Sequence, residues 1–276
     1  MAKARAKALL PKAPLAEVVF ELRWALQAGP EGVPVLQSDP GLIPLLDQFT
    51  GEMKKIGFGF TRDLSHPLQT GAHSVVRRFY KATDRPFPIM QIGPGIFATN
   101  ESSEYDWKPF KKQAEQGIRA LLRSYPKLNF FALKLIHIEL RYIDAFPASL
   151  VGNVALFTFL EKQTTLKIGL PQMLTDKKIL EPNAVGRFGF RATLAGRKQS
   201  QLQIELASGK NEETGEDLVR METKVVSLGS DVPTLANGSK AFRAIDSWLE
   251  KAHGITSPLF KQLIKPETLA NYRIGN

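Results

Sequence analysis

Few side chains in this sequence have the type and spacing of a metal or catalytic site. The chain has four histidines and no cysteine, which excludes disulfides, thiolate metal ligands and a cysteine nucleophile. His137 and Glu139 share one face of an expected strand, as in zinc deaminases, but the downstream cysteine pair of those enzymes is missing. His66 and His73 form the other suggestive pair. We therefore expect no metal and no cofactor.

Motifs of known catalytic and phosphate-binding sites are also missing. The sequence contains no nucleophile elbow, no P-loop and no zinc-protease helix motif. Gly93-Pro94-Gly95 lacks the dinucleotide-binding spacing and predicts a turn that ends a strand. The acidic stretch at 209–217 predicts a hairpin tip. No catalytic residue can be named, and the sequence favours a binding protein over an enzyme without deciding the question.

One charged motif occurs twice. Glu-Leu-Arg followed by an aromatic residue stands at 21–24 and again at 139–142. A glutamate and an arginine two apart on a strand share a face and can form ion pairs with each other or with a neighbouring strand. If the two strands lie at a pseudo-twofold axis, Glu21 is expected to meet Arg141, and Glu139 to meet Arg23.

Basic residues lie beside aromatic residues in two other strand-like runs, at 77–80 and 187–198. Arg77 and Phe79 would share one strand face, with Arg78 and Tyr80 on the other. With a net charge of +10 and a pI of about 9.7, these runs favour a polyanionic partner, although ordinary solvated strands explain them equally well. The candidate residues for binding nucleic acid or another partner are Arg77, Arg78, Tyr80, Arg187, Arg191, Arg197 and Lys198.

The elements expected to position these residues repeat in order along the chain. Alternating apolar residues predict strands, and apolar residues at helical spacing predict helices. In the first half, strands are expected at 17–24, 58–64, 74–82 and 87–100, and helices at 39–57 and 101–126. In the second half, strands are expected at 134–143, 186–196, 200–209 and 217–229, and helices at 153–163 and 239–254. Asp39 is expected to cap the first helix.

This order predicts an α+β fold of two pseudo-repeated units, each a strand, a helix, three strands and a helix. The units would form antiparallel sheet(s) covered by helices on one face, similar in element order to helix-grip and saddle-shaped folds. Matching Phe-Gly-Phe motifs at 58–60 and 188–190 and tryptophans on both closing helices support the repeat. We expect a basic flexible arm at 1–14 and repeats at 15–128 and 129–276, intimately joined and compatible with one compact domain.

Four motifs resemble a known protein family. They are PLAEVVFELRW near the start, QIGPGIFATN in the middle, LRYID at 140–144, and the ending that contains WLEKAH. The chain resembles, over roughly 14–274, a sporadically distributed, functionally uncharacterised bacterial family of about 250–280 residues. The resemblance transfers no active site. Its patchy distribution implies a setting such as mobile elements, toxin–antitoxin pairs or phage defence.

Three functional hypotheses follow. The first is a non-enzymatic protein that binds nucleic acid or a nucleoprotein through a basic open sheet face. The second is a protein-interaction subunit, such as a toxin neutraliser or defence accessory, whose partner is encoded nearby. The third is a small-molecule binder with a pocket between sheet and helices. No run of apolar residues is long enough to cross a membrane, and we expect a cytoplasmic location.

Overall fold

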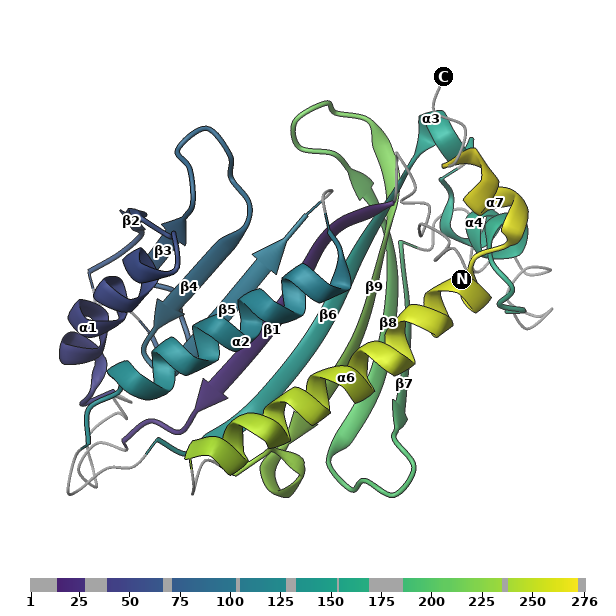
Figure 1. The fold of residues 1–276 in the computed structure, drawn as a ribbon. Coiled ribbons are helices and arrows are strands. Elements are labelled where there is room, and N and C mark those ends of the chain that lie inside the picture. The colour runs from purple at the N-terminus through teal and green to yellow at the C-terminus, as the bar shows by residue number, and fades with distance from the viewer. Residues whose placement is uncertain are drawn as a thin grey trace, which may run out of the picture.

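A single antiparallel sheet of nine strands organises the protein (Figure 1). The computed structural model describes residues 14–27, 39–66, 71–102, 105–127, 133–152, 154–168, 186–234 and 238–272. The expected arm at 1–14 lies, apart from Pro14, outside these residues, as does the expected boundary at 128/129.

The strands are β1 (Leu15–Trp24), β2 (Phe60–Asp63), β3 (Arg77–Tyr80), β4 (Ile89–Gly93), β5 (Ile96–Glu101), β6 (Leu135–Pro147), β7 (Arg187–Thr193), β8 (Ser200–Lys210) and β9 (Asp217–Leu228). The helices of the described residues are α1 (Leu42–Lys55), α2 (Trp107–Ser124), α3 (Ala148–Val151), α4 (Leu156–Gln163), α6 (Gly238–Leu263) and α7 (Pro266–Asn271), with a short 3-10 turn, η3, at Gly229–Asp231.

The two halves of the chain meet at β1 and β6, in the middle of the sheet. The strand order is β2-β3-β4-β5-β1-β6-β9-β8-β7, so the first half supplies five adjacent strands and the second half supplies four. β1 and β6 pair antiparallel, with Glu21 directly opposite Glu139. Both edge strands, β2 and β7, carry residues of the Phe-Gly-Phe motifs.

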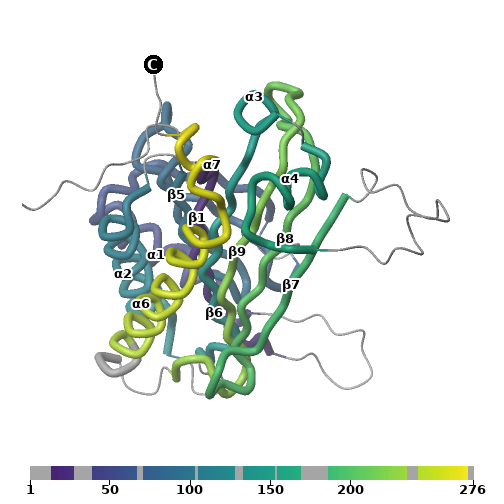
Figure 2. Tube along the Cα trace, turned by 90° about the vertical axis from the view of Figure 1, so that its right-hand side faces the viewer, coloured from purple at the N-terminus to yellow at the C-terminus, as the bar shows by residue number. Residues whose placement is uncertain are grey.

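The helices cover one face of this sheet. In Figures 1 and 2, α2 and α6 run across the same side, and α1 packs against α2. Strand residues with even numbers on β1, such as Phe20 and Leu22, point to this side and are almost fully buried. They belong to a large core with α1, α2 and the first part of α6. A second core joins the ends of β6, β8 and β9 to α4 and the end of α6.

Two elements differ from the sequence expectation. The run at 87–100 is a hairpin of β4 and β5 and not one strand, because Gly93-Pro94-Gly95 turns the chain. A Cβ at Gly93 would lie 1.9 Å from the carbonyl oxygen of Ser74, and Gly95 has a φ of +72°, so both positions need glycine. The last helix continues past Gly254 to Leu263 and contains Pro258, because packing on both cores outweighs the missing N–H of the proline.

Asp39 has a different role from the expected cap. The N-cap of α1 is Gly41, and no side chain caps this helix. The Asp39 carboxylate instead accepts hydrogen bonds from Trp24 Nε1 (2.8 Å), the Tyr125 hydroxyl (2.7 Å), Gly41 N (3.0 Å) and Gly95 N (3.2 Å). This buried hub connects β1, α1, α2 and the β4–β5 turn. In the part of the chain that the structure describes, no helix is long and apolar enough to span a membrane.

Candidate functional site

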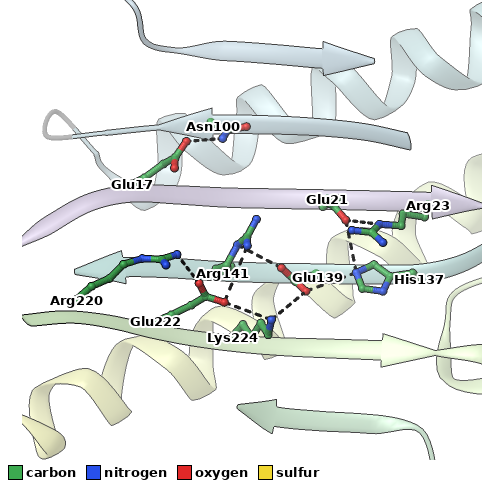
Figure 3. Close-up of polar contacts among 10 residues, drawn as sticks. All are labelled: Glu17, Glu21, Arg23, Asn100, His137, Glu139, Arg141, Arg220, Glu222 and Lys224. Carbon is green, nitrogen blue, oxygen red and sulfur yellow. Dashed lines mark hydrogen bonds and ion pairs between the residues drawn. The ribbon is translucent and has the colours of Figure 1, made fainter. Parts of the chain in front are cut away.

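The sheet face opposite the helices carries a connected line of charged side chains, which we call the charge ladder (Figure 3). β1, β6 and β9 alternate between the two faces, and each strand places charged residues opposite the core, with Val19, Ile143 and Val226 among them. The ladder consists of Arg23, Glu21, His137, Glu139, Arg141, Lys224, Glu222 and Arg220. We call this side of the sheet the uncovered face, because none of the described helices lies on it.

The repeated Glu-Leu-Arg motif supplies the centre of the ladder, but its pairing differs from the expectation. Arg23 Nε donates to Glu21 Oε1 at 2.6 Å, and Arg141 Nε lies 3.3 Å from Glu139 Oε1. Each arginine thus pairs within its own strand, in place of the expected exchange between strands. The register explains this result, because the two glutamates lie directly opposite each other.

His137 lies between these two carboxylates. Its Nε2 is 3.8 Å from Glu21 Oε1 and 3.6 Å from Glu139 Oε2, within ion-pair range if the ring is protonated. Burial alone would raise the pKa of Glu139, but His137, Arg141 and Lys224 outweigh it and hold that pKa below its usual value. Both glutamate side chains are only 9% exposed, so this part of the face is shielded from solvent.

The ladder continues across β9 through Glu222. Arg220 Nη2 donates to Glu222 Oε2 at 2.7 Å, and Lys224 Nζ lies 3.2 Å from Glu222 Oε1. Lys224 also reaches Glu139 at 4.0 Å, and Arg141 Nη1 reaches Glu222 at 3.9 Å. Leaving His137 aside, the charge ladder therefore contains three carboxylates, three guanidinium groups and one ammonium group. The middle of the uncovered face is nearly neutral and offers few free charges.

Amide side chains extend the polar face toward β3. Arg78 Nε donates to Gln91 Oε1 at 2.9 Å, and Gln91 Nε2 donates to Asn100 Oδ1 at 2.8 Å. Asn100 in turn donates to Glu17 on β1. These hydrogen bonds, made by residues of β4 and β5, fix the orientation of Arg78. The other guanidinium nitrogens of Arg78 remain available to a ligand.

The candidate residues of the first run fall on opposite faces, as their alternation predicts. Arg78 and Tyr80 lie on the uncovered face, whereas Arg77 shares the covered side with buried Phe79. Arg77 donates to Asp63 and, at 3.1 Å, to Thr50 of α1. The hydrogen bond from Arg77 holds the pKa of Asp63 below its usual value, more than offsetting partial burial. Arg77 therefore stabilises the β2–β3 edge and does not join Arg78.

Two residues that the sequence analysis missed complete this group. Arg62 and Phe60 of β2 lie directly opposite Arg78 and Tyr80, and Phe60 is 47% exposed. The alternation in Phe60-Thr61-Arg62 was the available signal, but only strand pairing places these side chains beside β3. We call Phe60, Arg62, Arg78 and Tyr80 the first edge cluster.

The candidate residues of the second run lie at the other edge of the sheet. Arg187 and Arg191 of β7 share the uncovered face, and Arg187 Nη2 pairs with Glu205 at 2.8 Å. Arg191 lines a shallow pocket of about 260 Å³ that also contains Gln203, Glu222 and Lys224. Arg197 and Lys198 are exposed in the β7–β8 turn. We call Arg187, Arg191, Arg197 and Lys198 the second edge cluster.

The structure does not bring the two edge clusters together. Seven strand steps separate β3 from β7, which is roughly 34 Å along the sheet at about 4.8 Å per strand. The charge ladder lies between the two clusters. A ligand that contacts both must therefore be extended.

The residues considered for metal binding and catalysis have structural contacts. His73 Nδ1 lies 2.9 Å from the carbonyl oxygen of Gly95. Glu216, in the β8–β9 turn, accepts a hydrogen bond from Ser149 N at 2.8 Å. In the part of the chain that is described, no three His, Asp or Glu side chains gather in a way that could hold a metal ion.

Comparisons with known proteins leave the geometry as the main evidence on function. The sequence matches no protein-family model, and no curated protein is significantly similar to it.

Proposed function

We propose that the protein binds a nucleic acid or a nucleoprotein through the uncovered sheet face and that it is not an enzyme. The observation that carries this proposal is the presence of a basic cluster at each end of that face. The net charge of +10 supports it, because a polyanion gains most from basic side chains that lack acidic partners. Arg62 and Arg191 have no ion pair with the described residues.

The arrangement suits an extended, single-stranded ligand. The nearly neutral charge ladder adds little attraction, so phosphates would be held at the two edges. Phe60 and Tyr80 present aromatic rings beside Arg62 and Arg78, and bases of any sequence can stack on such rings. A separation of roughly 34 Å equals about ten nucleotides at the 3.4 Å rise of a helically stacked strand.

Replacing Arg62 and Arg78 together with alanine is expected to weaken binding of single-stranded DNA and RNA about tenfold at 50 mM salt. Two lost phosphate contacts should also make the slope of log affinity against log salt shallower by about 1.4. Fluorescence polarisation with labelled oligonucleotides of 6, 12 and 20 nucleotides measures both quantities. The 12-mer should bind more tightly than the 6-mer, because a 6-mer whose bases stay stacked is too short to reach both clusters.

A matched control removes the same charge from the covered side. Lys54 of α1 and Lys251 of α6 are exposed, and their double alanine variant should leave the affinity nearly unchanged. If both double variants lost the same amount of affinity, net charge alone would explain the loss, and this result would contradict a specific binding surface. No binding by the wild-type protein at 50 mM salt would overturn the proposal.

A second candidate function is a protein-interaction subunit, such as a toxin neutraliser or defence accessory. Phe190, on edge strand β7, is 49% exposed, and an edge strand can pair with a strand of a partner protein. Co-expression with the product of a neighbouring gene, followed by size exclusion, tests this function. A stoichiometric complex that the Phe190→Ser variant loses would favour it over nucleic-acid binding.

The setting of either function is also part of the proposal. We propose a cytoplasmic protein of the sporadically distributed family that the sequence motifs resemble, acting in a mobile-element or phage-defence context. The support is the resemblance alone. A defence role predicts that deletion of the gene changes plating efficiency for at least one phage in a panel.

We further propose that the two halves descend from one duplicated unit with a helix-grip-like arrangement. Three facts support this origin: the repeated tetrapeptides lie on paired central strands, the Phe-Gly-Phe motifs lie at the two edge strands, and in each half a long helix with a tryptophan follows the strands. The first half has one strand more than the second, and this strand would then be a later difference between the repeats.

A further inference from the structure

A small cavity lies on the covered side of the sheet, where the two hydrophobic cores meet. α6 crosses both cores, with Leu249 in the first and Leu263 in the second. Between them, the cavity has a volume of about 140 Å³, and Leu15 of β1 is one of the residues that line it. We call it the seam pocket. A cavity of about 150 Å³ is large enough for benzene, so the seam pocket has room for about six non-hydrogen atoms.

Two buried polar groups in the seam pocket have unused hydrogen-bonding capacity. Asp144 of β6 is 4% exposed, and Thr223 of β9 is 1% exposed. Within the described residues, Thr223 Oγ1 has no hydrogen-bond partner, and burial, with no hydrogen bond or charge beside it, is the cause that shifts the pKa of the Asp144 carboxyl. Burial without a partner raises the pKa of Asp144 to about 8. Buried polar groups normally have partners, so both observations point to a binding site for a group that donates hydrogen bonds.

The walls of the seam pocket are aromatic and held in place. The Tyr105 and Tyr142 hydroxyls are 2.8 Å apart, and the Tyr142 hydroxyl lies 2.8 Å from His253 Nδ1. Trp107 stacks on the His253 ring at 3.9 Å between centroids. The rings of Tyr105, Tyr142, His253 and Phe260 line the seam pocket together with the Asp144 carboxyl group. Aromatic faces and a carboxylate together attract organic cations.

We propose that the seam pocket binds a small organic amine as its ammonium ion, with Asp144 as the counter-ion and Thr223 as a hydrogen-bond acceptor. The ammonium group would donate to Asp144 and Thr223, while the apolar part of the amine packs against Tyr105, Tyr142 and Phe260. Asp144 loses its proton to the solvent when the cation enters. This inference does not depend on the proposed function of the uncovered face.

Other titratable groups near Asp144 do not supply this charge. Tyr142 lies on the same strand and Tyr272 follows α7, and burial raises the pKa of both hydroxyls. His253 already contacts Tyr142 and Trp107. Lys261 is exposed and lines the seam pocket from α6, yet the pKa of Asp144 remains high. A bound ammonium ion would therefore be the first close cation.

The test compares amines with alcohols of the same shape. n-Butylamine and cyclopentylamine are titrated by NMR and by calorimetry against 1-butanol and cyclopentanol. The amines should bind at least tenfold more tightly than the alcohols. Calorimetry at pH 7 in buffers of different ionisation enthalpy should show release of about 0.9 proton per amine, because a group with the pKa of Asp144 is about nine-tenths protonated at that pH.

Two variants separate the site from the fold. Asp144→Asn should weaken amine binding at least tenfold and abolish proton release, while alcohol binding stays unchanged. Thr223→Val should weaken amine binding severalfold and leave proton release intact. Asp84→Asn, at an exposed turn, should bind like the wild type. Equal binding of amines and alcohols, undiminished amine binding by Asp144→Asn, or no binding of either amine at 10 mM would overturn the proposal.

Discussion

Replacing Asp144 with asparagine is expected to make the protein more stable at neutral and alkaline pH. The folded-state pKa of Asp144 is about 8, whereas an unfolded aspartate ionises near pH 4. Between these values the folded protein holds a proton that the unfolded chain releases, so rising pH favours unfolding. The wild type should lose up to about 1.4 kcal/mol of unfolding free energy per pH unit in this window, relative to the variant.

Chemical denaturation at pH 5, 6, 7 and 8 measures this difference. The two unfolding free energies should converge near pH 4 and differ by several kcal/mol at pH 8, where Asp144 of the wild type begins to ionise in the folded state. Asp84→Asn, which removes an exposed carboxylate, should track the wild type. Parallel curves for wild type and Asp144→Asn would show that Asp144 is ionised in the folded protein at all these pH values.

Replacing Asp39 with alanine is expected to reduce the unfolding free energy by about 3–5 kcal/mol. Four donors converge on this carboxylate, two from the backbone and two from the side chains of Trp24 and Tyr125. The substitution leaves them in a buried site without an acceptor, and each such group costs about 1–3 kcal/mol when it stays dry. A loss of this size is a large part of a typical domain stability.

Urea denaturation at pH 7 checks this expectation, with two comparison variants. Tyr125→Phe removes one donor and leaves Asp39 with three, so it should cost about 1–2 kcal/mol. Asp47→Ala removes an exposed aspartate on the neighbouring helix α1 and should change stability by less than about 0.5 kcal/mol. If Asp39→Ala were no more harmful than Tyr125→Phe, the hub would not hold the four elements together.

Local patterns in the sequence predicted most elements because strands such as β1 and β6 place alternate residues in the buried core. Leu22 and Leu140 are buried while Glu21 and Glu139 face away, as the period of two requires. The same period of two also contained information about Asp144. Asp144 is in phase with Leu140 and Tyr142, so an acidic residue stands at a position that should point toward the core.

Pairing between distant segments could not be predicted in the same way. Whether Glu21 meets Arg141 or lies opposite Glu139 depends on the register of two strands more than a hundred residues apart, and a shift of one residue changes every neighbour. Asp39 has the local features of a helix cap, but its strongest partners come from β1 and α2. The first edge cluster likewise required the pairing of β2 with β3.

The central position of β1 has a consequence for folding during synthesis. β1 pairs with β5 from its own half, but its other side stays an open strand edge until the ribosome has made β6. The first core also stays incomplete until α6 arrives, because Ile245, Leu249 and Ala252 pack into it. A chain released early would therefore expose an unpaired strand and an apolar surface together, the combination that favours aggregation. The long helix α6, made after all nine strands, thus completes the fold of the first half.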